Sequence, residues 1–246
     1  MPDRLSPVLP RVPAVDKRSV FAQQELFADI DPRELEKLAA YARPQHFRRG
    51  QTIFRKGDPG HSMMAVLTGT VKMVVPSSNG RELVLNLIHA GEAFGELALL
   101  DGRDRSTDAV AVTDADVLVL ERREFVPFLL SHPPVALKLL EVLAHKVRRT
   151  SEQVEDVVFL DLPARLAKTL LRLASNGHDP ARRGAVVSIT QKSLGQMVGT
   201  SRESVNKQLQ TWESRNWIAV AKGTVTLLEV DAMSELTAAE NDSDEL

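Results

Sequence analysis

Residues 94–110 contain the side chains with the most specific chemistry in this sequence. A carboxylate at Glu96 and a guanidinium at Arg105 lie nine residues apart, in a stretch that Gly95 and Gly102 mark as a tight loop. A guanidinium binds a phosphate through two parallel hydrogen bonds, and a carboxylate accepts a hydrogen bond from a sugar hydroxyl. The pair therefore predicts a site for a molecule with one phosphate charge and one free ribose hydroxyl, which describes a 3′,5′-cyclic nucleotide.

The neighbours of this pair favour a binding site over a surface ion pair. Ser106 and Thr107 follow Arg105, so their hydroxyls and backbone N–H groups can close on an anion. Alternatively, a Glu and an Arg at this spacing form a solvated pair worth less than about 1 kcal/mol. The apolar residues that we expect to pack around Gly95 support the site; they are Phe94, Leu97, Leu99 and Leu100.

The distribution of charge points to nucleic acid near the C-terminus. The chain has 246 residues, 43% of them hydrophobic, and a net charge of −2, and its length favours two domains. Residues 160–230 hold ten Lys and Arg against five Asp and Glu, whereas residues 231–246 hold six acids and no base. A local basic excess is typical of a surface that binds polyanions. The acidic end is predicted to be a disordered tail.

Several classes of function are excluded or disfavoured by composition. The chain has no Cys, which excludes disulfides, thiolate-bound iron–sulfur clusters and Cys nucleophiles. The six His are scattered, so we expect no metal and no haem. No apolar run approaches the eighteen or so residues of a membrane span, and the first residues lack an export signal. We therefore expect no membrane association and a cytoplasmic location.

Patterning along the chain predicts a β domain after a short helical start. Residues 1–18 are Pro-rich and are expected to form a flexible arm. Residues 19–134 are predicted to be the nucleotide-binding domain, with a helix start at Asp31-Pro32. From residue 47 to 120, recurring Gly residues divide the chain into short runs typical of antiparallel strands, which indicates a jelly roll or barrel. The clearest hairpin turn is Asn79-Gly80.

The longest helical pattern covers residues 135–159 and repeats its apolar positions every seven residues. That period predicts the seam of a parallel two-stranded coiled coil, and hence a homodimer. Alternatively, this is one amphipathic helix that lies on its own domain. The two seam positions are occupied by Leu140, Val147 and Val154, and by Leu143, Thr150 and Val157.

The hydroxyls of Thr150 and its neighbour Ser151 need a role, because a buried polar group is costly unless it is hydrogen-bonded. In one interpretation, Thr150 only sets the register of the two helices. Alternatively, Thr150 and Ser151 read the base of a bound nucleotide, since a hydroxyl both donates and accepts.

The basic segment 160–230 contains the pattern of a helix-turn-helix. Gly199 ends one short helix and Ser201 is a natural N-cap for the next. The first turns of the second helix enter the major groove in such a module, where Arg and Lys bind guanine and Glu accepts from cytosine. Alternatively, this is a polar surface helix. The residues predicted to contact DNA are Ser201, Arg202, Glu203, Asn206 and Lys207.

These motifs together resemble the Crp/Fnr family of bacterial transcription regulators over about residues 20–229. The likeness is especially close in residues 150–154, 159–161 and 201–205, and residues 94–110 resemble the phosphate-binding cassette of cyclic-nucleotide-binding domains. It implies an α+β fold with an N-terminal antiparallel β jelly roll, a long dimerisation helix and a C-terminal winged helix-turn-helix. It also implies that the protein is a regulator and not an enzyme. Such a regulator binds double-stranded DNA and cyclic AMP and works with RNA polymerase.

The resemblance also assigns roles to single residues. It implies that Glu96 binds the ribose hydroxyl within the Gly95 to Leu97 segment, that Arg105 and Ser106 bind the cyclic phosphate, and that Thr150 with the partner's Ser151 binds adenine. It implies a palindromic operator that resembles TGTGA with TCACA. Lys207 stands where the family commonly has an arginine, and lysine lacks the bidentate fork.

Three alternatives stay open at this point. In the first, the pocket is unused, which leaves a DNA-binding regulator that acts without ligand. In the second, the pocket is tuned to cyclic GMP or cyclic di-GMP. An enzyme on a cupin-like jelly roll is disfavoured, because the paired His residues of a metal site are missing from the strands.

Overall fold

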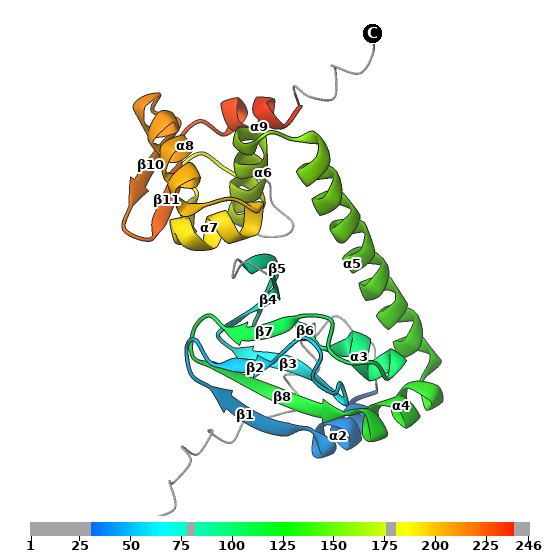
Figure 1. Cartoon of the computed structure of the whole chain (residues 1–246). Coiled ribbons are helices and arrows are strands. Elements are labelled where there is room, and N and C mark those ends of the chain that lie inside the picture. Colours follow the sequence, from blue (N-terminus) through cyan, green and yellow to red (C-terminus); the bar gives the residue numbers. More distant parts are fainter. Residues whose placement is uncertain (1–30, 78–81, 176–180, 239–246) are drawn as a thin grey trace, which may run out of the picture. The chain divides into compact units, whose positions relative to one another are not determined.

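The computed structural model describes residues 31–77, 82–175 and 181–238, which form two compact units (Figure 1). The first unit contains the described residues of Met1–Val74 and Asn86–Leu143, and the second contains those of Val75–Leu85 and Ala144–Leu246. The elements in chain order are α2 (Pro32–Tyr41), β1 (Arg43–Phe47), β2 (Thr52–Phe54), β3 (Ser62–Thr68), β4 (Thr70–Pro76), β5 (Glu82–His89), β6 (Ala93–Phe94), α3 (Glu96–Asp101), β7 (Asp108–Ala111), β8 (Ala115–Glu121), α4 (Arg122–Ser131), α5 (Pro133–Phe159), α6 (Leu162–Ala174), β9 (Val186–Ser188), α7 (Gln191–Val198), α8 (Arg202–Ser214), β10 (Ile218–Ala221), β11 (Thr224–Leu227) and α9 (Val230–Ala238).

Two four-stranded sheets build the first unit. Their strand orders are β1-β8-β3-β6 and β2-β7-β4-β5, so that strands neighbouring in sequence often belong to different sheets, as in a jelly roll. The pairs β1–β8, β3–β8, β3–β6, β2–β7 and β4–β7 are antiparallel. The predicted antiparallel β-roll is confirmed.

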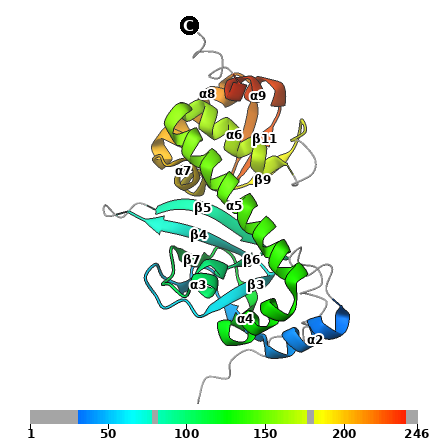
Figure 2. The ribbon, with the colours of Figure 1, turned by 90° about the vertical axis from the view of Figure 1, so that its right-hand side faces the viewer.

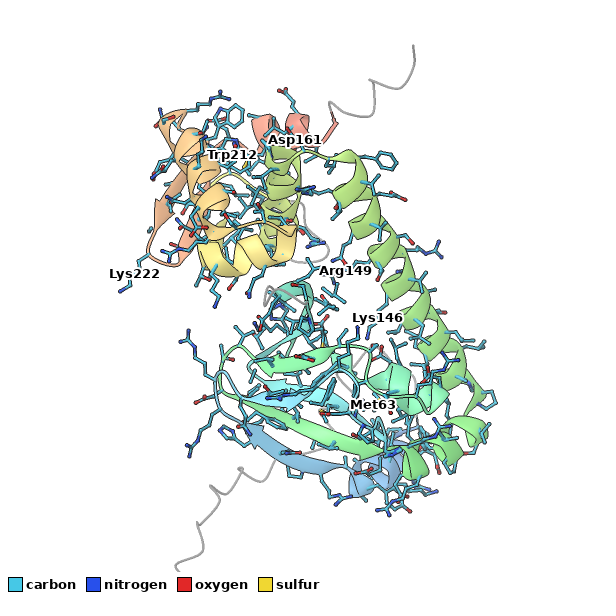
Figure 3. The ribbon with its side chains drawn as sticks, viewed as in Figure 1. Met63, Lys146, Arg149, Asp161, Trp212 and Lys222 are labelled. Atoms are coloured by element: carbon cyan, nitrogen blue, oxygen red, sulfur yellow. The ribbon has the colours of Figure 1, made fainter. Side chains whose placement is uncertain are left out.

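Strand β3 is buried on both faces because it separates two cores. Successive side chains of a strand point to opposite faces. Met64 and Val66 accordingly belong to the core between the two sheets, whereas Met63 and Ala65 belong to a core shared with α2, α4 and the start of α5. Figure 3 shows Met63 inside the first unit.

Three helices complete the core that contains Met63 and Ala65. Helix α2 begins at Pro32 as predicted, and the Asp31 carboxylate caps it by accepting from the N–H of Arg33 at 2.7 Å. Helix α4, which lies beside α2 (Figures 1 and 2), was missed by the sequence analysis. Helix α5 begins at Pro133, two residues before the predicted start, because proline is tolerated in the first turn of a helix.

Helices α4 and α5 were also compared with the requirements of a membrane span. Within residues 31–77, 82–175 and 181–238, no single helix is both long and apolar enough to cross a membrane. The pair α4 and α5 meets the requirement for length and composition only when taken together, and the two helices are bent by 112° at their junction.

The second unit contains α6 to α9 and a small sheet of order β10-β11-β9. Its core surrounds Trp212, which is 1% exposed and lies inside this unit in Figure 3. The prediction of a disordered tail from residue 231 is wrong for residues 231–238, because they belong to α9, which lies against α6. Val230, Met233 and Leu236 recur every third residue and pack on the core, a pattern that the high acid content obscured.

Some predictions fall outside the described residues. They are the flexible arm 1–18, the start of the folded part at residue 19, the Asn79-Gly80 turn and the last eight residues of the acidic tail.

Candidate nucleotide site and nucleic-acid interface

A short helix replaces the loop that was predicted around Gly95. Helix α3 lies between Gly95, with φ of 80°, and Gly102, with φ of 73°. Both angles are in the left-handed region, which glycine adopts without steric cost. The two glycines therefore start and end a helix of six residues, rather than mark one open loop.

Only one face of α3 is buried. Glu96 and Leu99, three residues apart, face inward and are 5% and 0% exposed. Leu97 is 51% exposed, so the expectation that it packs around Gly95 is wrong. The physical reason is the helical spacing, which turns Leu97 away from the face that Glu96 and Leu99 share.

Arg105 is buried and is held by two segments that precede it in the chain. Its Nη1 donates to the carbonyl oxygen of Gly95 at 2.8 Å, and its Nη2 donates to Oγ of Ser62 at 3.0 Å. Its guanidinium carbon lies 4.2 Å from the centre of the Phe54 ring, a cation–π contact. The Nε atom is buried and has no hydrogen-bond partner among the described residues.

The charge of Arg105 is maintained in spite of burial. Burial lowers the pKa of the guanidinium, and the carboxylates of Glu96 and Asp58 oppose that shift. Since an arginine stays protonated in proteins, the site presents a buried cation, with one buried donor nitrogen that lacks a partner, beside a buried carboxylate. A buried donor without a partner is costly, and an anionic acceptor would satisfy it.

Two glycines permit the close approach of the segments around Arg105. A Cβ on Gly95 would lie 2.7 Å from Nη1 of Arg105, and a Cβ on Gly60 would lie 2.1 Å from Cβ of Ala98 in α3. Gly95 was identified from the sequence, whereas Gly60 and Ser62 were missed as site residues. The sequence Gly57-Asp-Pro-Gly60, which is typical of a tight turn, was the available indication that this segment is fixed.

The other predicted ligand contacts have different surroundings. Ser106 is exposed beside Arg105. Thr150 and Ser151 belong to the part of α5 that lies in the second unit, whereas Glu96 and Arg105 belong to the first. Their hydroxyls donate to carbonyl oxygens one turn earlier in α5, those of Lys146 at 2.8 Å and Val147 at 3.2 Å.

An apolar stripe on α5 is exposed in the single chain. The predicted seam residues Val147 and Val154 are 66% and 58% exposed, and Leu140 and Val157 are similarly open. Leu143 differs, because it packs partly against the core of the first unit. Large apolar side chains exposed at this spacing are typical of a helix that pairs with another helix.

The predicted helix-turn-helix consists of α7 and α8 in the second unit. Gly199, with φ of 73°, ends α7, and Oγ of Ser201 accepts from the N–H of Ser204 at 3.1 Å to cap α8. The turn between them passes close to α7, since a Cβ on Gly195 would lie 2.9 Å from the carbonyl oxygen of Thr200. Gly195 was not identified from the sequence.

The side chains predicted to contact DNA differ in their exposure and in their hydrogen bonds within the unit. Arg202 and Lys207 are exposed. The pKa of Glu203 is lowered, first by a hydrogen bond from its own backbone N–H and then by one from Ser201. Asn206 is half-buried and accepts a hydrogen bond from Nε2 of Gln191 at 3.0 Å, so it also joins α7 to α8.

The wing adds a basic side chain that sequence analysis did not single out. Strands β10 and β11 pair from Ile218↔Leu227 to Ala221↔Thr224 and leave Lys222 at the turn. Lys222 is exposed, and Figure 3 shows it at the tip of the hairpin, directed away from the unit. The sequence did hold an indication that Lys222 matters, because this residue lies in the hairpin that the resemblance implied to be a wing.

Comparison with known proteins identifies both parts of the chain. Residues 44–132 match the cyclic nucleotide-binding domain, and residues 164–236 match the Crp-like helix-turn-helix domain. The chain is 30% identical over 217 residues to the CRP-like cAMP-activated global transcriptional regulator of Mycobacterium tuberculosis, which covers 87% of this chain and 97% of that protein. The chain belongs to the Crp/Fnr family.

Other members agree with this assignment. The Cyclic AMP receptor protein of Thermus thermophilus is 31% identical over 211 residues, which are 86% of this chain and 95% of that protein. The solved structure of CLP, the c-di-GMP responsive global regulator of Xanthomonas campestris, has the same fold, with a TM-score of 0.70 and 23% identity over 80% of this chain and 99% of that one.

The coarse function follows from the family. This Crp/Fnr protein is a cyclic-nucleotide-binding transcription regulator, and its relatives are regulators rather than enzymes. Helix-turn-helix regulators of this family bind DNA and act as dimers. Within the part of the chain that the structure describes, no group of three or more His, Asp or Glu side chains is placed to hold a metal ion.

Proposed function

We propose that this Crp/Fnr protein is a homodimeric regulator that binds cyclic AMP and then recognises a palindromic DNA operator. The observation that carries the proposal is the buried Arg105 guanidinium, whose Nε lacks a partner among the described residues and which lies beside the buried Glu96. One phosphate charge and one ribose hydroxyl match this cation and carboxylate. The relative from Mycobacterium tuberculosis, named as cAMP-activated, supports cyclic AMP as the ligand.

The proposed contacts use the chain's own donors and acceptors. Arg105 donates to the cyclic phosphate, the exposed hydroxyl of Ser106 adds a donor, and Glu96 accepts from the ribose 2′-hydroxyl. The segment from Gly95 to Leu97 borders the sugar. Thr150 of one protomer and the partner's Ser151 contact the adenine base, since each hydroxyl keeps acceptor lone pairs after it donates within α5.

The proposed DNA contacts come from the start of α8. Arg202 reads guanine, Glu203 accepts from cytosine N4, and Lys207 binds a guanine or a phosphate. Ser201 and Asn206 fix the helix and its angle to α7. A two-fold dimer requires a two-fold operator, and the proposed half-sites resemble TGTGA and TCACA. Contact with RNA polymerase and action in the cytoplasm belong to the same proposal.

The ligand is tested by calorimetric titration of cyclic AMP, cyclic GMP and cyclic di-GMP against the wild-type protein, Arg105→Ala and Arg103→Ala. Arg103 is a matched control, because it is an exposed arginine of the same segment. We expect the tightest binding for cyclic AMP, a loss of about 2–5 kcal/mol for Arg105→Ala, and no change for Arg103→Ala. Unchanged affinity in Arg105→Ala would remove Arg105 from the site.

The same titration separates the alternatives. Tighter binding of cyclic di-GMP or cyclic GMP would replace the proposed ligand. Binding of none of the three, together with full operator binding, would show a regulator that acts without a cyclic nucleotide.

The dimer is tested by sedimentation of Val147→Glu, which places a charge in the exposed apolar stripe of α5. We expect monomers at concentrations where the wild-type protein is a dimer, because a buried unpaired charge is strongly unfavourable. Arg148→Glu places the same side chain on the neighbouring exposed position outside the stripe and should remain dimeric. Dimers in both variants would contradict the proposed seam.

A further inference from the structure

Arg122 connects the two segments that hold Arg105, although it lies outside the nucleotide-binding motif. It is the first residue of α4 and directly follows β8. Its side chain is half-buried, and the family motif that the sequence analysis used ends twelve residues earlier, at residue 110. Nothing in the proposed contacts with nucleotide or DNA uses this arginine.

The first connection runs through the backbone to Ser62. Strands β3 and β8 pair with Ser62 opposite Glu121. The ladder continues for one step, because the N–H of Arg122 donates to the carbonyl oxygen of His61 at 2.7 Å. The start of α4 is therefore tied to the residue next to Ser62, whose Oγ accepts from Nη2 of Arg105.

The second connection runs through the side chain to α3. Nη1 of Arg122 donates to the carbonyl oxygens of Leu99 and Leu100, the latter at 2.8 Å. These carbonyls belong to the last turn of α3, where no intrahelical N–H is available and where a cation is favoured. Gly95, which precedes the same helix, supplies the carbonyl oxygen that accepts from Nη1 of Arg105.

We propose that Arg122 is a positioning residue of the nucleotide site, which holds α3 and the Ser62 segment in the arrangement that Arg105 needs. The inference rests on the proposed function. When a phosphate engages Arg105, its contacts with Gly95 and Ser62 change, and both segments are bound to Arg122. Ligand occupancy is thereby transmitted to the first turn of α4, which leads through one residue into α5.

The neighbouring Arg123 provides a matched control. It lies one residue further along α4, its side chain is 75% exposed, and it pairs with Glu124 at 3.2 Å. Exposed pairs of this kind contribute little to stability. A substitution of Arg123 therefore changes the charge at the start of α4 without touching α3.

The test compares Arg122→Ala, Arg122→Lys and Arg123→Ala in the full-length protein. Cyclic AMP affinity is measured by calorimetry, and amide hydrogen exchange is measured without ligand in peptides that cover residues 60–64 and 95–102. We expect Arg122→Ala to weaken cyclic AMP binding about tenfold and to speed exchange in the 95–102 peptide, since it removes the charge-assisted hydrogen bonds to α3. The 60–64 peptide should change less, because the backbone N–H of residue 122 still donates to the carbonyl oxygen of His61. Arg122→Lys should recover part of both effects, and Arg123→Ala should match the wild-type protein.

Each other outcome counts against the inference. Arg122→Ala with normal affinity and a lowered melting temperature would make Arg122 a purely structural residue. If Arg122→Ala does not fold, the same measurements on Arg122→Lys against Arg123→Lys decide, and equal affinities overturn the inference. A wild-type protein that binds no cyclic nucleotide overturns the proposed function and this inference together, whereas normal wild-type binding with unaffected Arg122 variants overturns this inference alone.

Discussion

The two candidate sites of this protein are built in opposite ways. The nucleotide site buries its charges and joins segments far apart in sequence, since Ser62, Gly95 and Arg105 meet through hydrogen bonds. The DNA interface lies on one local motif, and Arg202 and Lys207 project from it into solvent. A buried site depends on the packing of the whole unit around it, whereas an exposed reading surface depends on one helix that is held at a fixed angle.

In the first unit, one residue contributes to both ligand binding and stability, whereas in the second unit DNA binding and stability depend on different residues. Arg105 is both a proposed ligand contact and a hydrogen-bonding link inside the first unit. Arg202 has no comparable role in the core, because the core of the second unit is formed by other faces of α8, at Val205, Leu209 and Trp212.

The largest effect that separates the two units is expected from Trp212→Ala. Truncation of a buried Trp costs about 3–5 kcal/mol, and Trp212 is 1% exposed in the core of the second unit. We expect DNA binding to be lost while cyclic AMP binding is retained, as measured by anisotropy and calorimetry. Trp217→Ala, at a half-buried position, is the milder control. Loss of both activities would contradict the expectation that the nucleotide site folds without the core around Trp212.

An intermediate effect is expected from Arg202→Ala. Loss of one bidentate contact with a base costs about 1–3 kcal/mol of discrimination, so operator preference should fall while salt-dependent binding to other sequences persists. The thermal stability should not change, because Arg202 is exposed. Arg183→Ala, which removes an exposed ion pair with Glu229 at 3.2 Å, is the control. An equal loss on all sequences would make Arg202 a phosphate contact.

The smallest effect is expected from Gly199→Ala, which tests the angle between α7 and α8. An alanine at φ of 73° costs roughly 1–2 kcal/mol. Denaturant unfolding should show this loss in the second unit, and Gln210→Ala, at an exposed position of α8, should be nearly neutral. An unchanged free energy of unfolding in Gly199→Ala would show that the turn can adopt a conformation without a positive φ at this residue.

The same contrast explains what the sequence could predict. Helices α7 and α8 were predictable because Gly199 and Ser201 act within one turn of their own positions. The antiparallel β-roll was predictable from the spacing of glycines, a repeated local pattern. The family assignment followed from short motifs and is confirmed by the comparisons.

The rest depends on tertiary contacts that no local pattern specifies. The bond from Arg105 to Ser62 joins residues 43 apart in sequence. Leu97 was expected inside because it is apolar, but the helical turn of α3 places Glu96 inside instead. Helix α9 was missed because residues 231–246 were assessed together, with six acids and no base, although Met233 is fully buried.

The measurement that tests the central claim most directly is the affinity for a TGTGA–TCACA palindrome with and without cyclic AMP, in the wild-type protein and in Arg105→Ala. Fluorescence anisotropy at fixed salt gives both values. The account predicts that cyclic AMP strengthens wild-type binding by about 5- to 150-fold and leaves Arg105→Ala unchanged. Equal wild-type affinity in both conditions, or a full response in Arg105→Ala, would contradict it.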